Sequence, residues 1–264
     1  MISCLCITRG DRPALLSEAV SDFVRQTFSD RELLILHDGD DAADAGVRTI
    51  AGAYAGAPIR IERVAAGPRL GELRNLAIAR AHGEWVCQWD DDDRYHPDRL
   101  RLQWEHAQSQ RAAVNYLVDQ LHWFPPDDIL FWDDWGGEPY PMNVIQGTIL
   151  ARRAVLPPYP DIGRGEDTLH THALFRAEAT NAFRVSRLSG MGWCYIYRFH
   201  GGNVWDAAHH RAISAVKHLT PSRLLPRLAQ LRDRLTEYRP QLPSMRTHLG
   251  SGTGYVALGE ADHA

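Results

Sequence analysis

The alternation of short apolar runs with helical stripes constrains the fold of this chain most strongly. Residues 2–7 form an apolar run of strand length, and Gly10, Asp11 and Pro13 then mark a turn and a helix start, with Asp11 as the expected N-cap. Apolar residues recur at helical spacing as far as Val24, and residues 33–36 supply a second buried strand. A strand, a helix and a strand in this order predict a βαβ unit with parallel strands and a right-handed crossover.

The same alternation continues along the chain. Strands are expected at 59–64, 85–89, 114–118, 129–132 and 144–151, and helices at 72–81, 97–107 and 168–176. We therefore predict an α/β, Rossmann-like, doubly wound mixed sheet over residues 1–218, made of a first half (1–110) and an added, β-rich half (111–218).

The last part of the chain has a different pattern. Leucines at helical spacing among arginines predict an amphipathic helix over 222–238, within a C-terminal helical appendage at 219–249. Docking on the domain, on a second subunit in a homodimer, or peripherally on an anionic membrane surface all stay open for this helix. Residues 250–264 begin with a run of glycine, serine and threonine and are expected to form a flexible tail.

Charge and cysteine content exclude some classes of protein. Twenty-nine basic and 33 acidic residues give a formal charge of −4, which argues against a nucleic-acid partner. The four cysteines match neither a disulfide framework nor a paired zinc motif, so we expect reduced, buried thiols. Neither a signal-peptide pattern nor an apolar stretch of membrane-spanning length is recognisable, and we expect a cytoplasmic protein.

Four consecutive carboxylates, Asp90 to Asp93, directly follow the apolar run 85–89. Like charges at a strand end repel one another unless a cation neutralises them. Asp90 and Asp92 face the same way in an extended segment, and oxygen ligands select Mg²⁺ or Mn²⁺. A solvated acidic turn before the helix at Pro97 is the alternative, but ligands of open α/β sheets bind at the carboxyl ends of strands. The position therefore favours a metal site.

Further polar residues are expected at the same edge of the sheet. Asp38 follows the second strand and Thr8 and Arg9 end the first, while Arg74 and Asn75 lie on the helix before the aspartates. A guanidinium suits phosphate oxygens. Together these residues outline a site for a nucleotide diphosphate that uses a metal in place of a glycine-rich phosphate loop.

These segments resemble the family 2 glycosyltransferases of the GT-A fold. The resemblance rests on Thr8, on residues 26–39 (QTFSDRELLILHDG), on Arg74-Asn75, on residues 83–100 (GEWVCQWDDDDRYHPDRL), on residues 147–153 (GTILARR) and on Gly165-Glu166-Asp167, in the family's order over about 200 residues.

The resemblance implies an inverting, hexosyl-type transferase that moves a sugar from a nucleotide-diphosphate sugar, a UDP-sugar, to the hydroxyl of a saccharide or other acceptor. The first half would bind the donor and the second half the acceptor. Asp167 is the implied catalytic base. The implied donor-binding residues are Thr8, Arg9, Asp38, Arg74, Asp90 and Asp91. Within the D-x-D motif formed by Asp90, Asp91 and Asp92, Asp92 is the principal metal ligand and Asp90 lies nearer the ribose, with His200 as a late metal or phosphate contact.

The chain departs from the family in two places. The loop Arg9-Gly10-Asp11 lacks the aromatic residue or asparagine that often brackets the base, and His37-Asp38 replaces two acidic residues. Both departures concern the identity of the donor base.

Two other functions stay open. A metal-dependent nucleotidyltransferase or hydrolase could use His170, His172, His209 and His210, although imidazoles two positions apart on a helix point in different directions. A non-catalytic nucleotide-sugar or carbohydrate-binding protein could use the tryptophans between 104 and 135, for which core packing is the alternative; Trp132 and Trp135 in particular would form the lip of an acceptor site.

Overall fold

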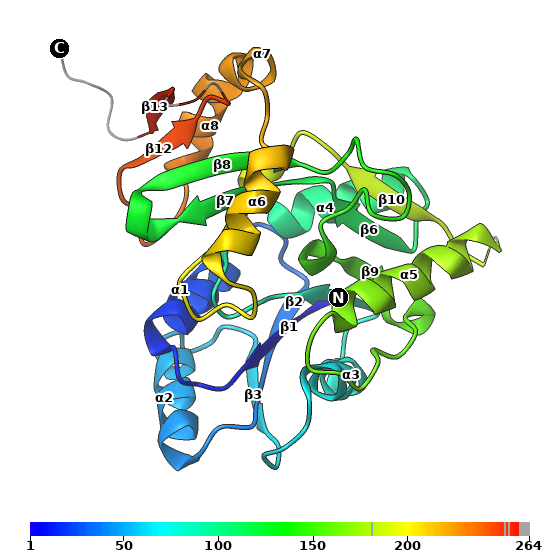
Figure 1. The fold of residues 1–264 in the computed structure, drawn as a ribbon. Helices are drawn as coiled ribbons and strands as arrows, with labels where there is room; N and C mark the ends of the chain where they lie inside the picture. The colour runs from blue at the N-terminus through cyan, green and yellow to red at the C-terminus, as the bar shows by residue number, and fades with distance from the viewer. Residues whose placement is uncertain (181, 251, 253, 259–264) are drawn as a thin grey trace.

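The computed structural model describes residues 1–264 except 181, 251, 253 and 259–264. Its first sheet has the strand order β10-β6-β9-β4-β1-β2-β3 (Figure 1). The strands are β1 (Ile2–Thr8), β2 (Arg31–His37), β3 (Ile59–Arg63), β4 (Trp85–Gln88), β6 (Val114–Leu117), β9 (Leu150–Arg152) and β10 (Val185–Leu188). β1 is parallel to β2 and β4, whereas β9 runs antiparallel to β4 and β6. The predicted doubly wound, mixed α/β sheet is confirmed.

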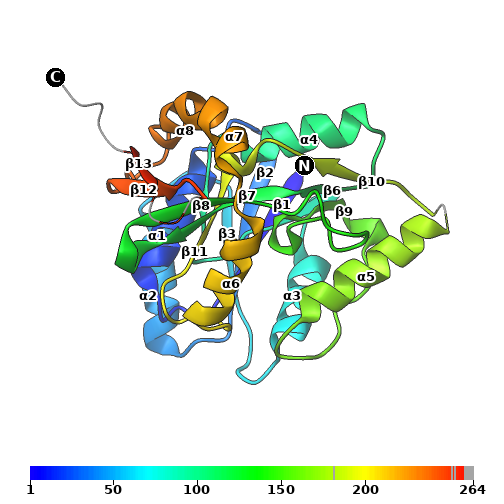
Figure 2. The same ribbon diagram turned by 45° about the horizontal axis from the view of Figure 1, so that its top comes forward.

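Helices cover both faces of this sheet because its strands are apolar on both sides. The helices are α1 (Pro13–Val24), α2 (Asp41–Gly52), α3 (Leu70–Arg80), α4 (Arg99–Ser109) and α5 (Glu166–Ala179). In β1, Cys4 and Cys6 pack with α1, α2 and α4, whereas Leu5 packs with α3 on the opposite face. α5 covers β6 and β9 through Leu174 and Phe175, beside α3 (Figure 2).

The second sheet has the order β13-β12-β8-β7-β11-β5. Its strands are β5 (Arg94–Tyr95), β7 (Asp119–Phe124), β8 (Ile129–Asp134), β11 (Tyr195–Arg198), β12 (Met245–His248) and β13 (Tyr255–Leu258). One hydrophobic core runs from α1 and the first sheet to Trp132 of the second half and Leu231 of the C-terminal region. The two halves expected from the sequence therefore share one hydrophobic core.

The C-terminal helical region is broken where a single helix over 222–238 was expected. It consists of α7 (Pro221–Leu224), a 3₁₀ turn η5 (Leu225–Arg227) and α8 (Leu228–Leu235). Pro226 lacks an N–H and cannot continue an α-helix in its interior, which explains the turn. Leu228, Leu231 and Leu235 are buried in the main core, so the domain itself covers the apolar face of α8.

Part of the expected flexible tail is a strand. β13 pairs antiparallel with β12, with Met245 opposite Leu258, and β12 in turn extends β8. Gly250 and Gly252 have φ of 74° and 59°, which lets the connection between β12 and β13 turn tightly. The prediction for 251, 253 and 259–264 lies outside the described residues.

Other local expectations need correction. α6 (Ala207–Lys217) and α2 have no counterpart in the predicted pattern, and of the strand expected at 144–151 only β9 forms, after a 3₁₀ turn η2 (Gln146–Thr148). Within the turn, the Thr148 hydroxyl donates to the Ile145 carbonyl and accepts from the Leu117 N–H, which replaces strand pairing. The four cysteines are free and buried. Across the described helices, none combines the length and the apolarity that a bilayer crossing requires.

Candidate active site

The carboxyl ends of β1, β2 and β4 meet at one edge of the first sheet. Thr8 ends β1, Asp38 follows β2, and the acidic loop Asp90–Asp93 follows β4. The Thr8 hydroxyl donates to Asp91 Oδ2 at 2.5 Å, which ties the first strand to the acidic loop. Parallel strands that share an edge bring Thr8 into contact with the acidic loop, as the sequence predicts, and place Asp38 at the end of the neighbouring strand.

Asp93 holds the acidic loop against the second sheet. Its carboxylate is buried, and it accepts hydrogen bonds from the Tyr195 hydroxyl at 2.5 Å and from the Arg198 N–H at 3.0 Å. Burial, together with the charges of Asp92 and Asp90, raises its pKa well above the usual range. Asp93 therefore fixes the loop and is turned away from the open edge of the site.

Asp91 is also buried and is held by two donors. Besides Thr8, Arg12 Nη2 donates to Asp91 Oδ1 at 2.7 Å. Burial and the neighbouring charge of Asp92 raise the pKa of Asp91 to about 6, while Arg12 opposes the shift. The resemblance assigns Thr8 and Asp91 to the donor, and in this structure the two bind each other.

Asp92 is the more accessible of the loop's central carboxylates and faces a histidine from a distant part of the chain. Its Oδ2 lies 3.0 Å from His200 Nε2 and 2.5 Å from Arg12 Nη1. His200 follows β11 and is positioned by its own N–H, which donates to Asn203 Oδ1 at 2.8 Å. The structure thus brings together Asp92 and His200, two of the three expected metal ligands, whereas the third, Asp90, faces Arg74 and Gln88.

Arg12 is a site residue that sequence reasoning missed. It precedes α1 directly and occupies the N-cap position expected for Asp11, without capping the helix through its side chain. Its guanidinium instead contacts Asp91, Asp92 and His200. An arginine among turn residues gives no sequence signal of such a contact, because the contact depends on a loop about 80 residues later in the chain.

Arg74 links the acidic loop to α5. Its Nη1 lies 3.7 Å from Asp90 Oδ1, and its Nε donates to Glu166 Oε1 at 3.1 Å. Burial alone would lower the pKa of Arg74, but the charges of Asp90 and Glu166 raise it above its ordinary value. Gln88 Nε2 donates to the other oxygen of Asp90 at 2.7 Å. Glu166, like Arg12, is a site residue that the sequence did not assign.

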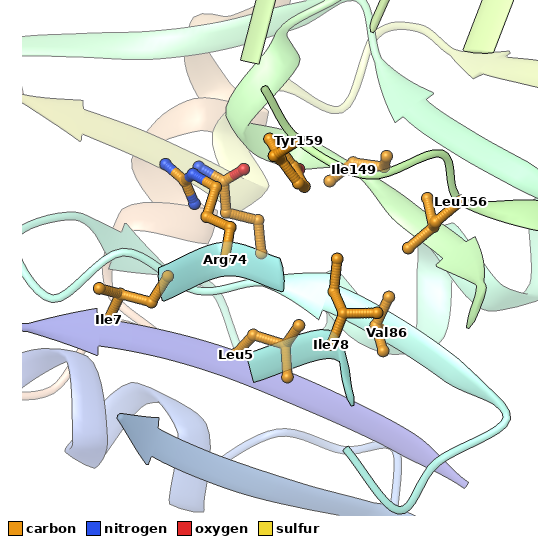
Figure 3. Close-up of a pocket in the computed structure, with 9 residues that line it drawn as sticks. Leu5, Ile7, Arg74, Ile78, Val86, Ile149, Leu156 and Tyr159 are labelled. Carbon is orange, nitrogen blue, oxygen red and sulfur yellow. The ribbon is translucent and has the colours of Figure 1, made fainter. Parts of the chain in front are cut away.

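A small, mostly apolar cavity of about 20 Å³ lies behind Arg74 (Figure 3). Figure 3 shows Arg74 on α3 at one side of it, with Tyr159 of the segment before α5 opposite. Arg74 lies over the Tyr159 ring at 5.6 Å, and Asn75 Nδ2 donates to the Tyr159 carbonyl at 2.8 Å. The mostly aliphatic walls offer few hydrogen-bond partners to sugar hydroxyls, so this cavity does not resemble a sugar pocket.

Asp167 lies in the first turn of α5, directly after Glu166. Its Oδ1 accepts a hydrogen bond from the Thr168 N–H at 2.7 Å, and the side chain is half-buried. The Thr168 hydroxyl donates to Gln146 of the turn η2 at 3.1 Å. Arg74, through Glu166, therefore places the helix start that carries Asp167 beside the acidic loop.

Asp38 lies in a separate hollow beside the end of β2. The hollow has a volume of about 550 Å³ and is lined by Asp38, Gly39, Asp40, Arg63, Val64, Ala65 and Ala66. Arg63 Nη1 donates to Asp41, which leaves Asp38 facing the hollow without a hydrogen bond to its side chain among the described residues. The exposed Arg9 precedes Gly10, and its carbonyl lies against Gly39.

The residues present fit a divalent cation. Two adjacent ligands of an octahedral cation at about 2.1 Å lie about 3.0 Å apart, and this is the separation of Asp92 Oδ2 and His200 Nε2. In the part of the chain that the structure describes, no group of three His, Cys, Asp or Glu side chains forms a complete metal site. The protein thus offers a partial ligand set that a bound phosphate and water would complete.

Comparison with known proteins matches the first part of the chain to a family. Residues 4–127, which contain most of β1, the helices α1–α4 with the strands between them, and the acidic loop, match the family described as Glycosyl transferase family 2. These residues, somewhat less than half of the chain, form a family 2 glycosyltransferase domain.

Solved structures share the fold of this glycosyltransferase. A structure of Staphylococcus aureus TarS 1–349 in complex with UDP-GlcNAc matches with a TM-score of 0.57 and 15% identity, over 90% of this chain and 67% of that one. The mannosyltransferase PcManGT from Pyrobaculum calidifontis, in complex with GDP-Man and Mn²⁺, matches with a TM-score of 0.59 and 13% identity, over 85% and 64%. A longer TarS structure is covered over 49% of its length, so this chain spans about half of it.

The residues of the two other candidate functions have structural roles in the glycosyltransferase. His170 stacks on Tyr159 at 3.7 Å between ring centroids, whereas His172 contacts Met142, so the two imidazoles do not meet at one site. Trp132 is buried and donates to Asp119, and Trp135 packs against the core. The interpretation of Trp132 as the lip of an acceptor site was wrong, because its side chain is buried in the main hydrophobic core.

Proposed function

We propose that this glycosyltransferase transfers a sugar from a UDP-sugar to an acceptor hydroxyl with inversion at the anomeric carbon. The observation that carries the proposal is the connection from Asp90 through Arg74 to Glu166. It sets a carboxylate cluster suited to a cation beside a second, half-buried carboxylate, Asp167. Transfer from a nucleotide diphosphate needs both, one for the leaving group and one for the proton.

In this scheme Asp92 and His200 would hold Mn²⁺ or Mg²⁺, with Asp90 nearer the ribose. The cation would supply positive charge to the diphosphate as its bond to the sugar breaks. Asp167 accepts the proton of the acceptor hydroxyl while that oxygen bonds to the anomeric carbon. Arg74 fixes the position of the helix start that carries Asp167 relative to the acidic loop, and Asp93 anchors that loop to Tyr195.

The hollow at Asp38 is proposed to receive the base. A carboxylate accepts from the ring N–H of uracil, thymine or guanine, whereas cytosine has no ring N–H. Thr8, Arg9 and Asp91 belong to the same edge. Of the structural neighbours, the TarS structure is in complex with UDP-GlcNAc and PcManGT with GDP-Man, so this fold accommodates either base. The resemblance in sequence favours UDP.

The acceptor is proposed to approach between α5 and the loop after His200. Arg164 Nη2 donates to the Val204 carbonyl at 3.2 Å, and its guanidinium lies 4.7 Å from the Trp205 ring. This bridge joins the segments that carry Asp167 and His200. Val204 and Trp205 are 54% and 44% exposed, which provides apolar surface at the rim for a saccharide ring.

A thermal-shift panel tests the proposal. UDP-, GDP-, CMP- and dTDP-sugars are added with Mn²⁺ or with EDTA, and the unfolding temperature is measured. A ligand of the native state at 100 times its Kd stabilises by about 2.7 kcal/mol. We expect the largest shift for a UDP-sugar with Mn²⁺ and a negligible shift for CMP-sugars. The absence of a metal-dependent shift with every nucleotide would contradict the proposal.

A further inference from the structure

Arg12 occupies the position that a cation at Asp92 and His200 would take. Its Nη1 lies 2.5 Å from Asp92 Oδ2 and 2.9 Å from His200 Nε2, the two atoms of the candidate ligand pair. Nη2 is bound to Asp91 Oδ1 at 2.7 Å. A guanidinium nitrogen and a metal ion cannot both contact Asp92 Oδ2 and His200 Nε2 from the same side, so the two positive charges exclude each other there.

The contacts of His200 are not all satisfied while Arg12 is in place. Nε2 has either one proton or one lone pair, yet it faces a carboxylate oxygen at 3.0 Å and a guanidinium nitrogen at 2.9 Å. With a proton, Nε2 donates to Asp92 but its N–H points at the N–H of Arg12. Without a proton, Nε2 accepts from Arg12 but its lone pair faces the carboxylate oxygen of Asp92. A cation in place of Nη1 would use the lone pairs of both Nε2 and Oδ2, which removes this conflict.

The exchange is also sterically open. The Arg12 side chain is 31% exposed and Asp92 is 17% exposed, whereas Asp91 is 3% exposed. The guanidinium can therefore leave Asp92 while Nη2 stays on the buried Asp91. Because the Arg12 side chain does not cap α1, movement of the side chain alone breaks no hydrogen bond of the helix.

We propose that Arg12 is an exchangeable counter-cation: it neutralises Asp92 in the nucleotide-free enzyme and leaves Asp92 and His200 when the divalent cation binds. The inference rests on the proposed cation site. A cation alone has to compete with Arg12, whereas a cation that arrives with a diphosphate gives the displaced guanidinium a new anionic neighbour. Arg12 thereby couples cation binding to donor binding and keeps the empty site from holding a metal tightly.

Mn²⁺ affinity provides the test. The Kd for Mn²⁺ is measured by electron paramagnetic resonance, with and without UDP, for the wild type, Arg12→Gln, Arg12→Lys and Arg48→Gln. Arg48, 58% exposed on α2, is the matched control for loss of one positive charge. Without UDP we expect Arg12→Gln to bind Mn²⁺ at least about tenfold more tightly than the wild type, because a positive charge a few ångströms away has been removed. Arg12→Lys, which keeps the positive charge, and Arg48→Gln should both bind Mn²⁺ within about threefold of the wild type.

The possible results separate the inference from the proposed function. If the wild type binds Mn²⁺ with UDP but Arg12→Gln binds it no more tightly than Arg48→Gln does, the inference is wrong and the cation site stands. If no protein binds Mn²⁺ even with UDP, the cation site is wrong and the inference falls with it. Should Arg12→Gln fail to fold by circular dichroism, phenylglyoxal modification of wild-type Arg12 decides: millimolar Mn²⁺ should accelerate it, and an unchanged rate overturns the inference.

Discussion

Replacing Asp167 by asparagine separates the proton-transfer role of this residue from its structural role. Asp167 Oδ1 accepts from the Thr168 N–H at 2.7 Å, and an asparagine Oδ1 can accept the same hydrogen bond. The variant loses one negative charge in the first turn of α5, which costs about 0.3–1 kcal/mol of stability. The fold and the donor site should therefore survive.

The catalytic loss should be far larger than the loss of stability. A general base contributes about 10²–10⁴-fold to a rate, which corresponds to about 2.7–5.5 kcal/mol of activation free energy. Glu166 cannot replace Asp167, because its side chain is 5% exposed and its Oε1 accepts from Arg74 at 3.1 Å. We expect kcat to fall by two to four orders of magnitude.

The assay is the release of UDP from the donor identified by the thermal-shift panel, measured against pH, together with calorimetric binding of UDP and Mn²⁺. Asp167→Asn should keep the nucleotide affinity of the wild type while kcat falls at every pH. Glu166→Gln is the matched control for loss of one carboxylate in the same turn, and its kcat should fall less. Turnover of Asp167→Asn within about tenfold of the wild type would remove Asp167 from the role of base.

Three further perturbations test other parts of the account. His200→Ala removes one of two converging donors and should weaken Mn²⁺ binding about 10- to 100-fold in the presence of UDP, measured by paramagnetic resonance; equal affinity would exclude His200 as a ligand. Burial lowers the pKa of His96 to about 4, so on acidification the unfolded chain takes up a proton near pH 6.5 that the folded protein refuses. Stability should therefore fall by about 2 kcal/mol from pH 7 to 5 through this group. In His96→Gln, the loss of unfolding free energy between pH 7 and 5, measured by urea unfolding, should be smaller by about that amount; an unchanged loss refutes the assignment. A Cβ on Gly71 would lie 1.9 Å from the Pro160 carbonyl, so Gly71→Ala should cost about 1–3 kcal/mol and loosen the segment before α5. Gly46→Ala, on α2 with open space around it, should be neutral or stabilising by about 0.5–1 kcal/mol, and similar unfolding free energies for the two variants would count against the close approach.

The elements whose periodicity is local could be predicted from the sequence. β1, α1, β2, α3 and β4 lie within a few residues of their expected bounds, because an apolar run or a helical stripe reports which face is buried. α2 buries Val47 alone, so its pattern is too weak to indicate a helix. The second sheet depends on pairings between distant segments, such as β12 with β8, that no local pattern records.

The candidate site divides in the same way. The positions of Asp38, Asp90 and Thr8 follow from the rule that parallel strands end at one edge. The contact of His200 with Asp92 was suggested only by the resemblance to the family. Nothing in the sequence suggested the contact of Arg74 with Glu166. Arg12 could not be found from the sequence, because an arginine beside a helix start is equally typical of a solvent-exposed residue.

The measurement that tests the central claim most directly is calorimetric binding of UDP to the wild type and to Asp92→Asn, each with Mn²⁺ and with EDTA. The account predicts tight binding to the wild type only with Mn²⁺, and the same weak affinity for Asp92→Asn whether or not the metal is present. Equal UDP affinity of the wild type with Mn²⁺ and with EDTA, or full metal dependence in Asp92→Asn, would contradict it.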